Sequence, residues 1–321
     1  MKDRWGRTIE YVRLSLTDAC NFRCPYCRPE EITPDHVTNL LTPIEWMKIL
    51  EAFHLLGVKA LRLTGGEPLL YPGIEELLGR VKQSQWFSDI SMTTNASLLA
   101  LKAKELKELG LDRVNISLDS VEEKAFAIAV GKDNQLPAVL EGIQSAIDGE
   151  FKSVKINTVL SRYWSDEEVG QFLAYIKQWT VIWRCIEYMP FQGDSFKGPN
   201  FDEWRTQIER VIKGKLVPAT AVPGYGPATY VTLPNGQVMG FIFAMSHNYC
   251  DTCNRVRLTS DGRLRLCLLR DDEMSLVDYV RNGASIEQLA EYIVDVLQLR
   301  HDKHDNCIKK TLQRPMWRIG G

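Results

Sequence analysis

The sequence predicts an α/β fold, in which a partial (β/α)6 barrel is followed by a smaller α+β domain. From residue 11 to about residue 190, short β-rich runs alternate with longer segments of helical periodicity, which is typical of βα units around a parallel sheet. Six such units follow one another without a GxGxxG motif, which favours a barrel over an open doubly wound sheet. The composition changes near Pro190, so we expect domains at 1–190 and 191–321.

The six candidate strands are rich in β-branched and aliphatic residues and are each followed by turn or polar residues. They span residues 11–16, 60–64, 90–94, 113–118, 154–159 and 183–188. Parallel strands place ligands at their carboxyl ends, so we expect the chemistry in the loops that follow each strand.

Helix signals occupy the connections between these strands. Thr42 before Pro43 and Glu45 predicts a helix start, and Gly57 predicts its end. In the third connection, four leucines repeat on one face, which we expect to pack on the sheet. These are Leu98, Leu101, Leu106 and Leu109.

The C-terminal part carries different signals. A helix is expected at 201–212, and Asn235-Gly236 between β-rich runs at 230–233 and 238–243 predicts a hairpin. Two further helices are expected at 275–281 and 285–299.

The net charge of −2 gives no global attraction to nucleic acid or to an anionic membrane. The chain has no signal-like start and no apolar run near the roughly 20 residues that span a bilayer. Six of the eight cysteines fall in two tight groups, which favours thiolate ligands in a reducing cytoplasm over disulfides. Cys185 and Cys307 lie apart from both groups, and we interpret them as buried or incidental.

The first cysteine group, Cys20, Cys24 and Cys27, directly follows the first strand. A loop this short can point three sulfurs at one centre. Three thiolates can ligate three irons of a [4Fe–4S] cluster and leave the fourth iron open to a substrate or cofactor. A structural zinc site, which normally needs four ligands, and a site without metal remain as alternatives.

The second strand ends in Thr64-Gly65-Gly66-Glu67-Pro68, where glycines let the backbone approach a ligand closely. CxxxCxxC after the first strand and GGEP after the second resemble the radical S-adenosylmethionine (SAM) superfamily. The resemblance implies a TIM-type barrel in which a reduced cluster transfers an electron to SAM. SAM then breaks into methionine and a 5′-deoxyadenosyl radical, which abstracts hydrogen from a substrate.

The resemblance also implies a SAM site. Gly65, Gly66 and Glu67 would surround the methionine amino group, Tyr26 and Met189 would lie near adenine, and Ser117 and Asn157 would contact the SAM body.

A second cysteine group comprises Cys250, Cys253 and Cys267. A second [4Fe–4S] cluster with an open iron is the favoured interpretation, and a zinc site completed by His247 or by a distant residue is the alternative. Arg255 and Arg257 lie between Cys253 and Cys267, and strand alternation puts both guanidinium groups on one side, where they could bind a polyphosphate. The chain has no P-loop motif, so arginines would have to supply the positive charge.

Together these features resemble the GTP 3′,8-cyclase family of molybdenum cofactor biosynthesis, over nearly the whole chain. In that family the first cluster cleaves SAM, and the open iron of the second binds the guanine of GTP. The resemblance implies that the C-terminal domain closes the barrel mouth and that the following positions hold GTP: Arg13, Arg62, Thr93, Lys155, Arg184, Arg255 and Arg257. Arg13, Arg255, Arg257, Gly320 and Gly321 are implied to support the reaction itself.

The implied reaction removes the ribose 3′ hydrogen of GTP and joins C3′ to guanine C8. The implied partners are an electron donor such as flavodoxin or ferredoxin and the next pathway enzyme, cyclic pyranopterin monophosphate synthase. A homodimer is among the assemblies the family allows. The chain departs from the family at Ala96, where glycine is common, and in the loops at 28–39 and 130–135.

Three rival hypotheses remain. A radical SAM peptide-maturing enzyme with an auxiliary cluster would leave the Arg255 and Arg257 pair unexplained. A non-catalytic iron–sulfur electron carrier would need four ligands for each closed cluster. A zinc-stabilised nucleic-acid module fits poorly with the acidic charge balance.

Overall fold

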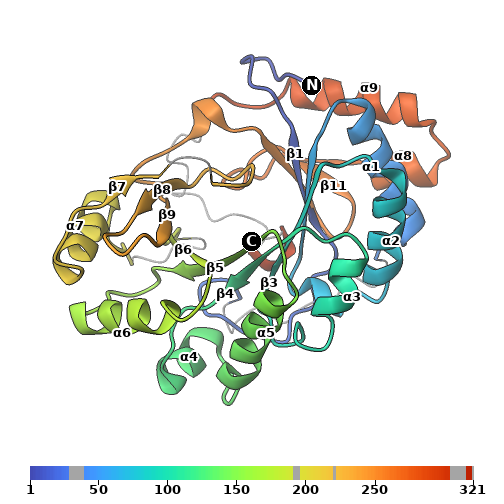
Figure 1. Cartoon of the computed structure of the whole chain (residues 1–321). Helices are drawn as coiled ribbons and strands as arrows, with labels where there is room; N and C mark the ends of the chain where they lie inside the picture. Colours follow the sequence, from blue (N-terminus) through green and yellow to red (C-terminus); the bar gives the residue numbers. More distant parts are fainter. Residues whose placement is uncertain (29–39, 191–195, 220–221, 304–315, 320–321) are drawn as a thin grey trace.

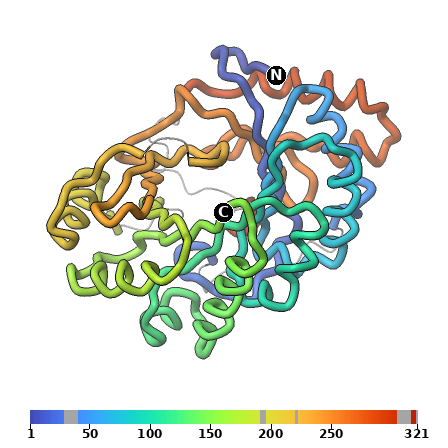
Figure 2. The backbone as a smooth tube through the Cα atoms, in the orientation of Figure 1, coloured from blue at the N-terminus to red at the C-terminus, as the bar shows by residue number. Residues whose placement is uncertain are grey.

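The computed structural model describes residues 1–28, 40–190, 196–219, 222–303 and 316–319. A curved sheet occupies the centre, and helices surround it (Figure 1). The tube in Figure 2 shows that the C-terminal segments return to the strands near the N-terminus. Within the described residues no helix is both long enough and apolar enough to cross a membrane.

Six parallel strands form the middle of the sheet, as the sequence predicts. They are β1 (Tyr11–Ser15), β2 (Ala60–Thr64), β3 (Asp89–Thr94), β4 (Arg113–Ser117), β5 (Ser153–Val159) and β6 (Ile182–Ile186). Consecutive strands pair in sequence order, with Arg13 level with Arg62 and Asn157 level with Arg184. The partial barrel is therefore confirmed.

The parallel run continues past these six strands on both sides, which the sequence patterns did not predict. β9 (Val238–Ile242) adds beside β6, and β10 (Arg255–Leu258) adds beside β1. Antiparallel strands extend each edge: β8 (Thr229–Thr232) and β7 (Val217–Pro218) beyond β9, and β11 (Arg263–Arg265) and β12 (Glu273–Ser275) beyond β10. In the described part of the chain β9 and β10 do not pair, so the barrel is open.

Helices connect the strands and cover the outer face of the sheet. They are α1 (Pro43–Leu55), α2 (Ile74–Ser84), α3 (Ala103–Glu108), α4 (Glu123–Val130), α5 (Leu136–Asp148), α6 (Asp166–Ile176), α7 (Phe201–Val211), α8 (Val277–Arg281) and α9 (Ile286–Leu297). Short 3₁₀ turns add η1 (Pro68–Leu70), η2 (Cys250–Thr252) and η4 (Met316–Arg318). Thr42 and Glu45 form the expected capping box of α1.

The predicted leucine face of the third connection is partly wrong. α3 begins at Ala103, and the preceding residues form turns in which Lys102 N–H donates to the Leu99 carbonyl at 3.0 Å. Leu101 is 86% exposed, whereas Leu99 and Leu106 are fully buried. Ala96 has a left-handed φ of 62°, and its carbonyl accepts from Leu99 N–H in the first of these turns. The turns bury Leu99, which the leucine spacing did not predict.

Strand alternation separates the hydrophobic core from the polar interior of the barrel. In β2, Leu61 and Leu63 belong to the core, whereas Arg62 between them faces the pocket inside the barrel. The same alternation on β1 places Val12 and Leu14 in the core and Arg13 in the pocket. The folding of the helices onto the sheet therefore fixes which cations face inward.

Candidate active site

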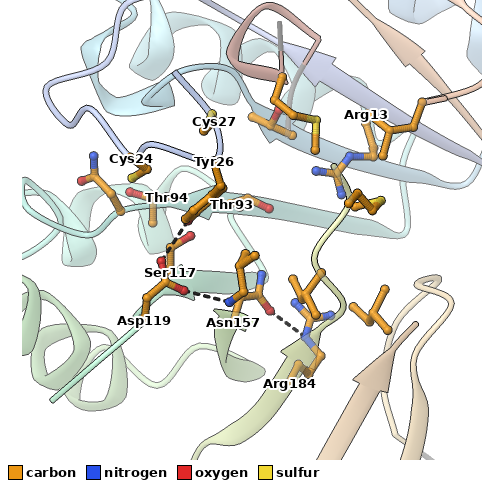
Figure 3. A pocket seen from close by; sticks show the side chains of 18 of the residues that line it. Arg13, Cys24, Tyr26, Cys27, Thr93, Thr94, Ser117, Asp119, Asn157 and Arg184 are labelled. Carbon is orange, nitrogen blue, oxygen red and sulfur yellow. Dashed lines mark hydrogen bonds between the residues drawn. The ribbon is translucent and has the colours of Figure 1, made fainter. Parts of the chain in front are cut away.

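A large pocket occupies the inside of the barrel at the carboxyl ends of the strands. Its lining includes the first cysteine group, the end of β2 and cations from several strands. Figure 3 shows Cys24 and Cys27 on one side of this pocket and Arg13 and Arg184 on the other. The strand ends therefore bring together residues that lie far apart in the sequence.

The glycine loop after β2 packs against the segment that precedes Cys20. Gly66 N–H donates to the Thr17 carbonyl at 2.7 Å, and Glu67 N–H donates to the Ala19 carbonyl at 2.8 Å. A Cβ on Gly66 would lie 2.3 Å from the Ala19 carbonyl oxygen, closer than real contacts allow. Both glycines line the pocket, so glycine is required here to pack the loop against the segment entering Cys20.

Glu67 does not line the pocket, although the resemblance implied that it contacts SAM. Its carboxylate accepts hydrogen bonds from the Thr94 hydroxyl at 2.7 Å, Asn95 N–H at 2.7 Å and Leu69 N–H at 3.1 Å. Burial raises the pKa of Glu67 to about 7 in spite of these bonds. Glu67 thus ties the end of β2 to the end of β3.

The first cysteine group is chemically suited to a cationic cluster. Cys20, Cys24 and Cys27 are free thiols on the pocket wall, and a tight turn joins Cys27 N–H to the Cys24 carbonyl at 2.9 Å. Burial raises the pKa of all three thiols, that of Cys27 to about 12. Iron would favour the thiolate forms that burial disfavours. Within the described residues no three His, Cys, Asp or Glu side chains converge on a single metal ion.

The residues predicted to contact SAM lie around the same space. Gly65, Gly66, Tyr26, Ser117, Asn157 and Met189 all line the pocket. Tyr26 donates a hydrogen bond from its hydroxyl to the Asp119 carboxylate at 2.9 Å (Figure 3). Burial raises the pKa of Asp119 to about 6. Asp119 fixes the ring of Tyr26 beside the cysteines.

A row of cations crosses the barrel beyond the SAM positions. The strand register places Arg257, Arg13 and Arg62 side by side on β10, β1 and β2, and all three line the pocket. Burial, together with the charges of Arg62 and Arg255, lowers the pKa of Arg13 to about 10. Arginine side chains stay charged in proteins, so burying three of them side by side is unfavourable because of desolvation and mutual repulsion. A bound polyanion would offset both effects.

Lys155, on β5, does not line the pocket. Its ammonium group donates to the Pro223 carbonyl at 2.6 Å and to the Tyr230 hydroxyl at 3.1 Å. Burial, followed by the charge of Arg184, lowers the pKa of Lys155 to about 6. A nearby anion would raise that pKa and favour the charged lysine.

The second cysteine group lines a smaller pocket that meets the first. Cys250, Cys253 and Cys267 line this second pocket. The residues common to both pockets are Met189, Tyr249, Arg255, Arg257 and Leu268. Both predicted arginines therefore stand at the passage between the two cysteine groups, with the guanidinium of Arg255 4.9 Å from the centre of the Tyr249 ring.

The thiols of this group do not share one environment. Burial acts to raise the pKa of Cys253, but the guanidinium groups of Arg255 and Arg300 outweigh it and lower that pKa. Burial raises the pKa of Cys267. The protein thus makes the Cys253 thiol easier to deprotonate than the Cys267 thiol.

Family models match both parts of the chain. Residues 14–176 match the Radical SAM superfamily, and residues 181–306 match Molybdenum Cofactor Synthesis C. A GTP 3′,8-cyclase of Thermodesulfovibrio yellowstonii is 39% identical over 100% of both chains. A GTP 3′,8-cyclase of Listeria monocytogenes is 35% identical over 100% of this chain and 99% of the relative. The chain belongs to the GTP 3′,8-cyclase family.

Solved structures support the same fold. Streptococcus suis SuiB bound to S-adenosylmethionine superposes with a TM-score of 0.62 and 16% identity, covering 89% of this chain and 68% of that chain. The protein anSMEcpe with bound AdoMet gives a TM-score of 0.57 and 13% identity, covering 92% and 82%. At these identities the likeness extends to the fold alone.

Several residues of this GTP 3′,8-cyclase family site escaped the sequence analysis. The hydroxyls of Thr64 and Thr93 are buried and have no hydrogen-bond partner among the described residues, and both threonines line the pocket. Thr93 was predicted, but Thr64 was not. Asp119, Glu187 and Tyr249 also line the pocket. Their signal was positional, because each lies near a strand end or beside a predicted ligand.

Some of the predicted positions lie outside the residues that the structure describes. Gly320, Gly321 and Cys307 lie outside the described residues, as does most of the loop at 28–39. Met316, nearby in sequence to the terminal glycines, lines the pocket, and Trp317 is 1% exposed. Cys185 is a buried core residue on β6, as expected.

Proposed function

We propose that this chain converts GTP to (8S)-3′,8-cyclo-7,8-dihydroguanosine 5′-triphosphate, the first step of molybdenum cofactor biosynthesis. The observation that carries the proposal is the shared wall between the two cysteine pockets, formed in part by Arg255 and Arg257. A substrate held there would reach both cysteine groups at once. The 35–39% identity to GTP 3′,8-cyclases over the full chain supports the same substrate.

The first cysteine group and the glycine loop would hold a [4Fe–4S] cluster and SAM. When bound, these groups supply the 5′-deoxyadenosyl radical that removes the ribose 3′ hydrogen of GTP. Gly65 and Gly66 would present backbone groups to the methionine end of SAM, beside Tyr26. The unpartnered hydroxyl of Thr64 offers a further hydrogen bond at this end of the pocket.

The triphosphate of GTP would lie along the cation row. Arg13, Arg62 and Arg257 are level on neighbouring strands, so their planar guanidinium groups can bind several phosphate oxygens together. Arg255 would add charge at the entrance to the second pocket. Arg184, Lys155 and Thr93 would act from β6, β5 and β3. Gly320 and Gly321 are proposed, from the family alone, to support the reaction.

The second cysteine group would hold a second [4Fe–4S] cluster that binds guanine. Cys250, Cys253 and Cys267 can supply three thiolates and leave one iron for the base. This arrangement would hold the guanine while the arginines hold the phosphates. Residues 1–190 would thus generate the radical and supply several of the cations for the phosphates, and residues 191–321 would add the second cluster with Arg255 and Arg257.

The proposed activity needs partners. We propose flavodoxin or ferredoxin as the electron donor, and transfer of the product to cyclic pyranopterin monophosphate synthase. A cytoplasmic location and a homodimer are also proposed. The free cysteines of the two groups support a reducing compartment, because free thiols persist there.

Anaerobic reconstitution with iron and sulfide, followed by SAM, a reductant and GTP, tests the proposal. We expect 5′-deoxyadenosine and cyclised GTP, measured by mass-resolved chromatography. Cys20→Ala should abolish both products, Cys267→Ala should abolish cyclised GTP, and Cys185→Ala, in the hydrophobic core, should retain both. Absence of 5′-deoxyadenosine from the wild type would exclude radical SAM chemistry. SAM cleavage without GTP turnover would exclude GTP as the substrate.

A further inference from the structure

Arg300 makes a group of contacts that the sequence analysis did not predict. It follows α9, and its side chain is 4% exposed. Its Nη2 lies 2.9 Å from the Cys253 sulfur, and its Nη1 donates to the Cys253 carbonyl at 3.0 Å. Nη2 also donates to the Arg255 carbonyl at 3.2 Å. One guanidinium thus holds a predicted ligand sulfur and the backbone on both sides of Asn254.

The N-terminal segment orients this guanidinium through Asp3. The fully buried carboxylate of Asp3 accepts from Arg300 Nη1 at 3.0 Å and from Arg7 Nε at 2.6 Å. It also accepts from the backbone N–H groups of Trp5 and Arg7, both at 3.0 Å. The ion pairs are almost completely shielded from water, so removal of one partner should be costly.

Arg7 extends the same network to the other cysteine of the CxxC pair. Its Nη1 donates to the Cys250 carbonyl at 3.0 Å. Trp5 adds a further contact by donating from its indole N–H to the Arg300 carbonyl at 2.7 Å. A single carboxylate therefore orients two arginines, and each arginine contacts one of the two cysteines.

We propose that Arg300 is a positioning residue of the second cluster, donating an N–H···S hydrogen bond to the Cys253 thiolate while Asp3 and Arg7 brace the loop. This inference rests on the proposed function, because it requires a cluster on Cys250, Cys253 and Cys267. Hydrogen bonds to ligand sulfurs stabilise the more reduced, more negative cluster and raise its reduction potential. Arg300 thus couples the N-terminal segment to the electronic state of the cluster.

The test isolates the second cluster by using the full-length Cys20→Ala/Cys24→Ala/Cys27→Ala variant as the parent. Iron content, the electron paramagnetic resonance spectrum with and without GTP, and the midpoint potential are measured anaerobically. Arg300→Gln in this parent removes the charge and the forked donor. We expect a lower midpoint potential for this variant. A tenfold weaker preference for the reduced cluster would lower the potential by about 59 mV for one electron.

Arg300→Lys and Arg281→Gln provide the comparisons. Lysine keeps one charged donor, so its potential should lie between those of the parent and Arg300→Gln. Arg281 on α8 pairs with Glu45 at 2.8 Å on the outside of the barrel and serves as a control for the loss of a structural ion pair. Its substitution should leave the spectrum and potential unchanged. If Arg300→Gln does not fold, the potential of Arg300→Lys decides the question.

The outcomes separate the two proposals. A parent without iron would mean that the second cluster, and with it the proposed function, is wrong. A parent with iron whose spectrum and potential are unchanged by both Arg300 substitutions would overturn the Arg300 role alone. A lower melting temperature with an unchanged potential would make Arg300 merely a structural tie.

Discussion

Arg184 on β6 donates a hydrogen bond from Nε to the Oδ1 of Asn157 on β5 at 2.9 Å. Its Nη2 also donates to the Oδ1 of Asn115 on β4 at 2.6 Å. The side chain that we propose for GTP is therefore bonded to the one that we propose for SAM. A change at Arg184 should affect both ligands.

Arg184→Lys tests this connection. Lysine retains a positive charge but lacks the planar fork that reaches both asparagines. Hydrogen bonds to charged groups contribute about 1.5–3 kcal/mol, so kcat/KM for GTP should fall about 10- to 100-fold. The KM for SAM should rise as well. Arg205→Lys, an exposed change on α7, is the control. An increase in the KM for GTP with an unchanged KM for SAM would contradict the connection.

Gly66→Ala should damage the first cluster specifically. The added Cβ would overlap the Ala19 carbonyl oxygen at 2.3 Å and push away the segment that enters Cys20. We expect less bound iron and loss of 5′-deoxyadenosine formation. Gly79→Ala in α2 is the matched control, because its nearest neighbour would lie at 3.7 Å. The prediction is wrong if both variants bind wild-type amounts of iron.

Glu67→Gln should change the pH dependence of stability. Burial holds the pKa of Glu67 at about 7, above its ordinary value of 4.5, so the native state retains its proton longer than the unfolded state. The Glu67 contribution is therefore complete below pH 4.5 and is lost as pH rises through 7. Glutamine does not titrate, and it presents an N–H group to one of the three donors that now surround the carboxylate.

We therefore expect the free-energy difference between wild type and Glu67→Gln to narrow from pH 5 to pH 8. Urea unfolding of the metal-free proteins at both pH values measures this difference. At pH 5 the variant should be about 1–3 kcal/mol less stable, the usual cost of an unsatisfied buried polar group. A difference that stays constant from pH 5 to pH 8 would contradict the prediction, because a Glu67 that is ionised in both the native and the unfolded state gives no pH dependence over this range.

The six central strands and the inward cations could be predicted because both follow from local patterns. The resemblance implied a role for Arg13 and Arg62, and in the structure both face the pocket while their neighbours on the strands belong to the core. The parallel pairing of β9 and β10 could not be predicted in the same way. Each lies in an antiparallel hairpin locally, and its parallel partner is distant in the chain. Local periodicity contains no information about such a partner.

The site shows the same division. The cysteine groups were found because their spacing is unusual by itself. Asp3 and Arg300 are ordinary charged residues separated by 297 positions, and only the fold brings them to Cys253. The unpartnered hydroxyl of Thr64 also became visible only when the surrounding donors and acceptors could be counted.

The departure at Ala96 leads to a prediction about Gly142. Ala96 is buried with a left-handed φ of 62°, and a Cβ on Gly142 in α5 would lie 2.3 Å from its carbonyl oxygen. Alanine favours helices over glycine by about 1 kcal/mol, but overpacking of a core costs about 1–3 kcal/mol. Because the overlap is with backbone, overpacking should prevail, and Gly142→Ala should lower the melting temperature.

The same substitution should weaken SAM cleavage, because Ala96 adjoins a pocket residue. Asn95 donates to the Asn21 side chain at 2.8 Å, and Asn21 lies within the first cysteine motif. Displacement of Ala96 would therefore reach the cluster loop. Gly170→Ala in α6, whose nearest neighbour would be at 3.7 Å, should keep both stability and SAM cleavage. Thermal unfolding and 5′-deoxyadenosine assays of the two variants measure the difference, and equal behaviour would show that α5 can yield at Gly142.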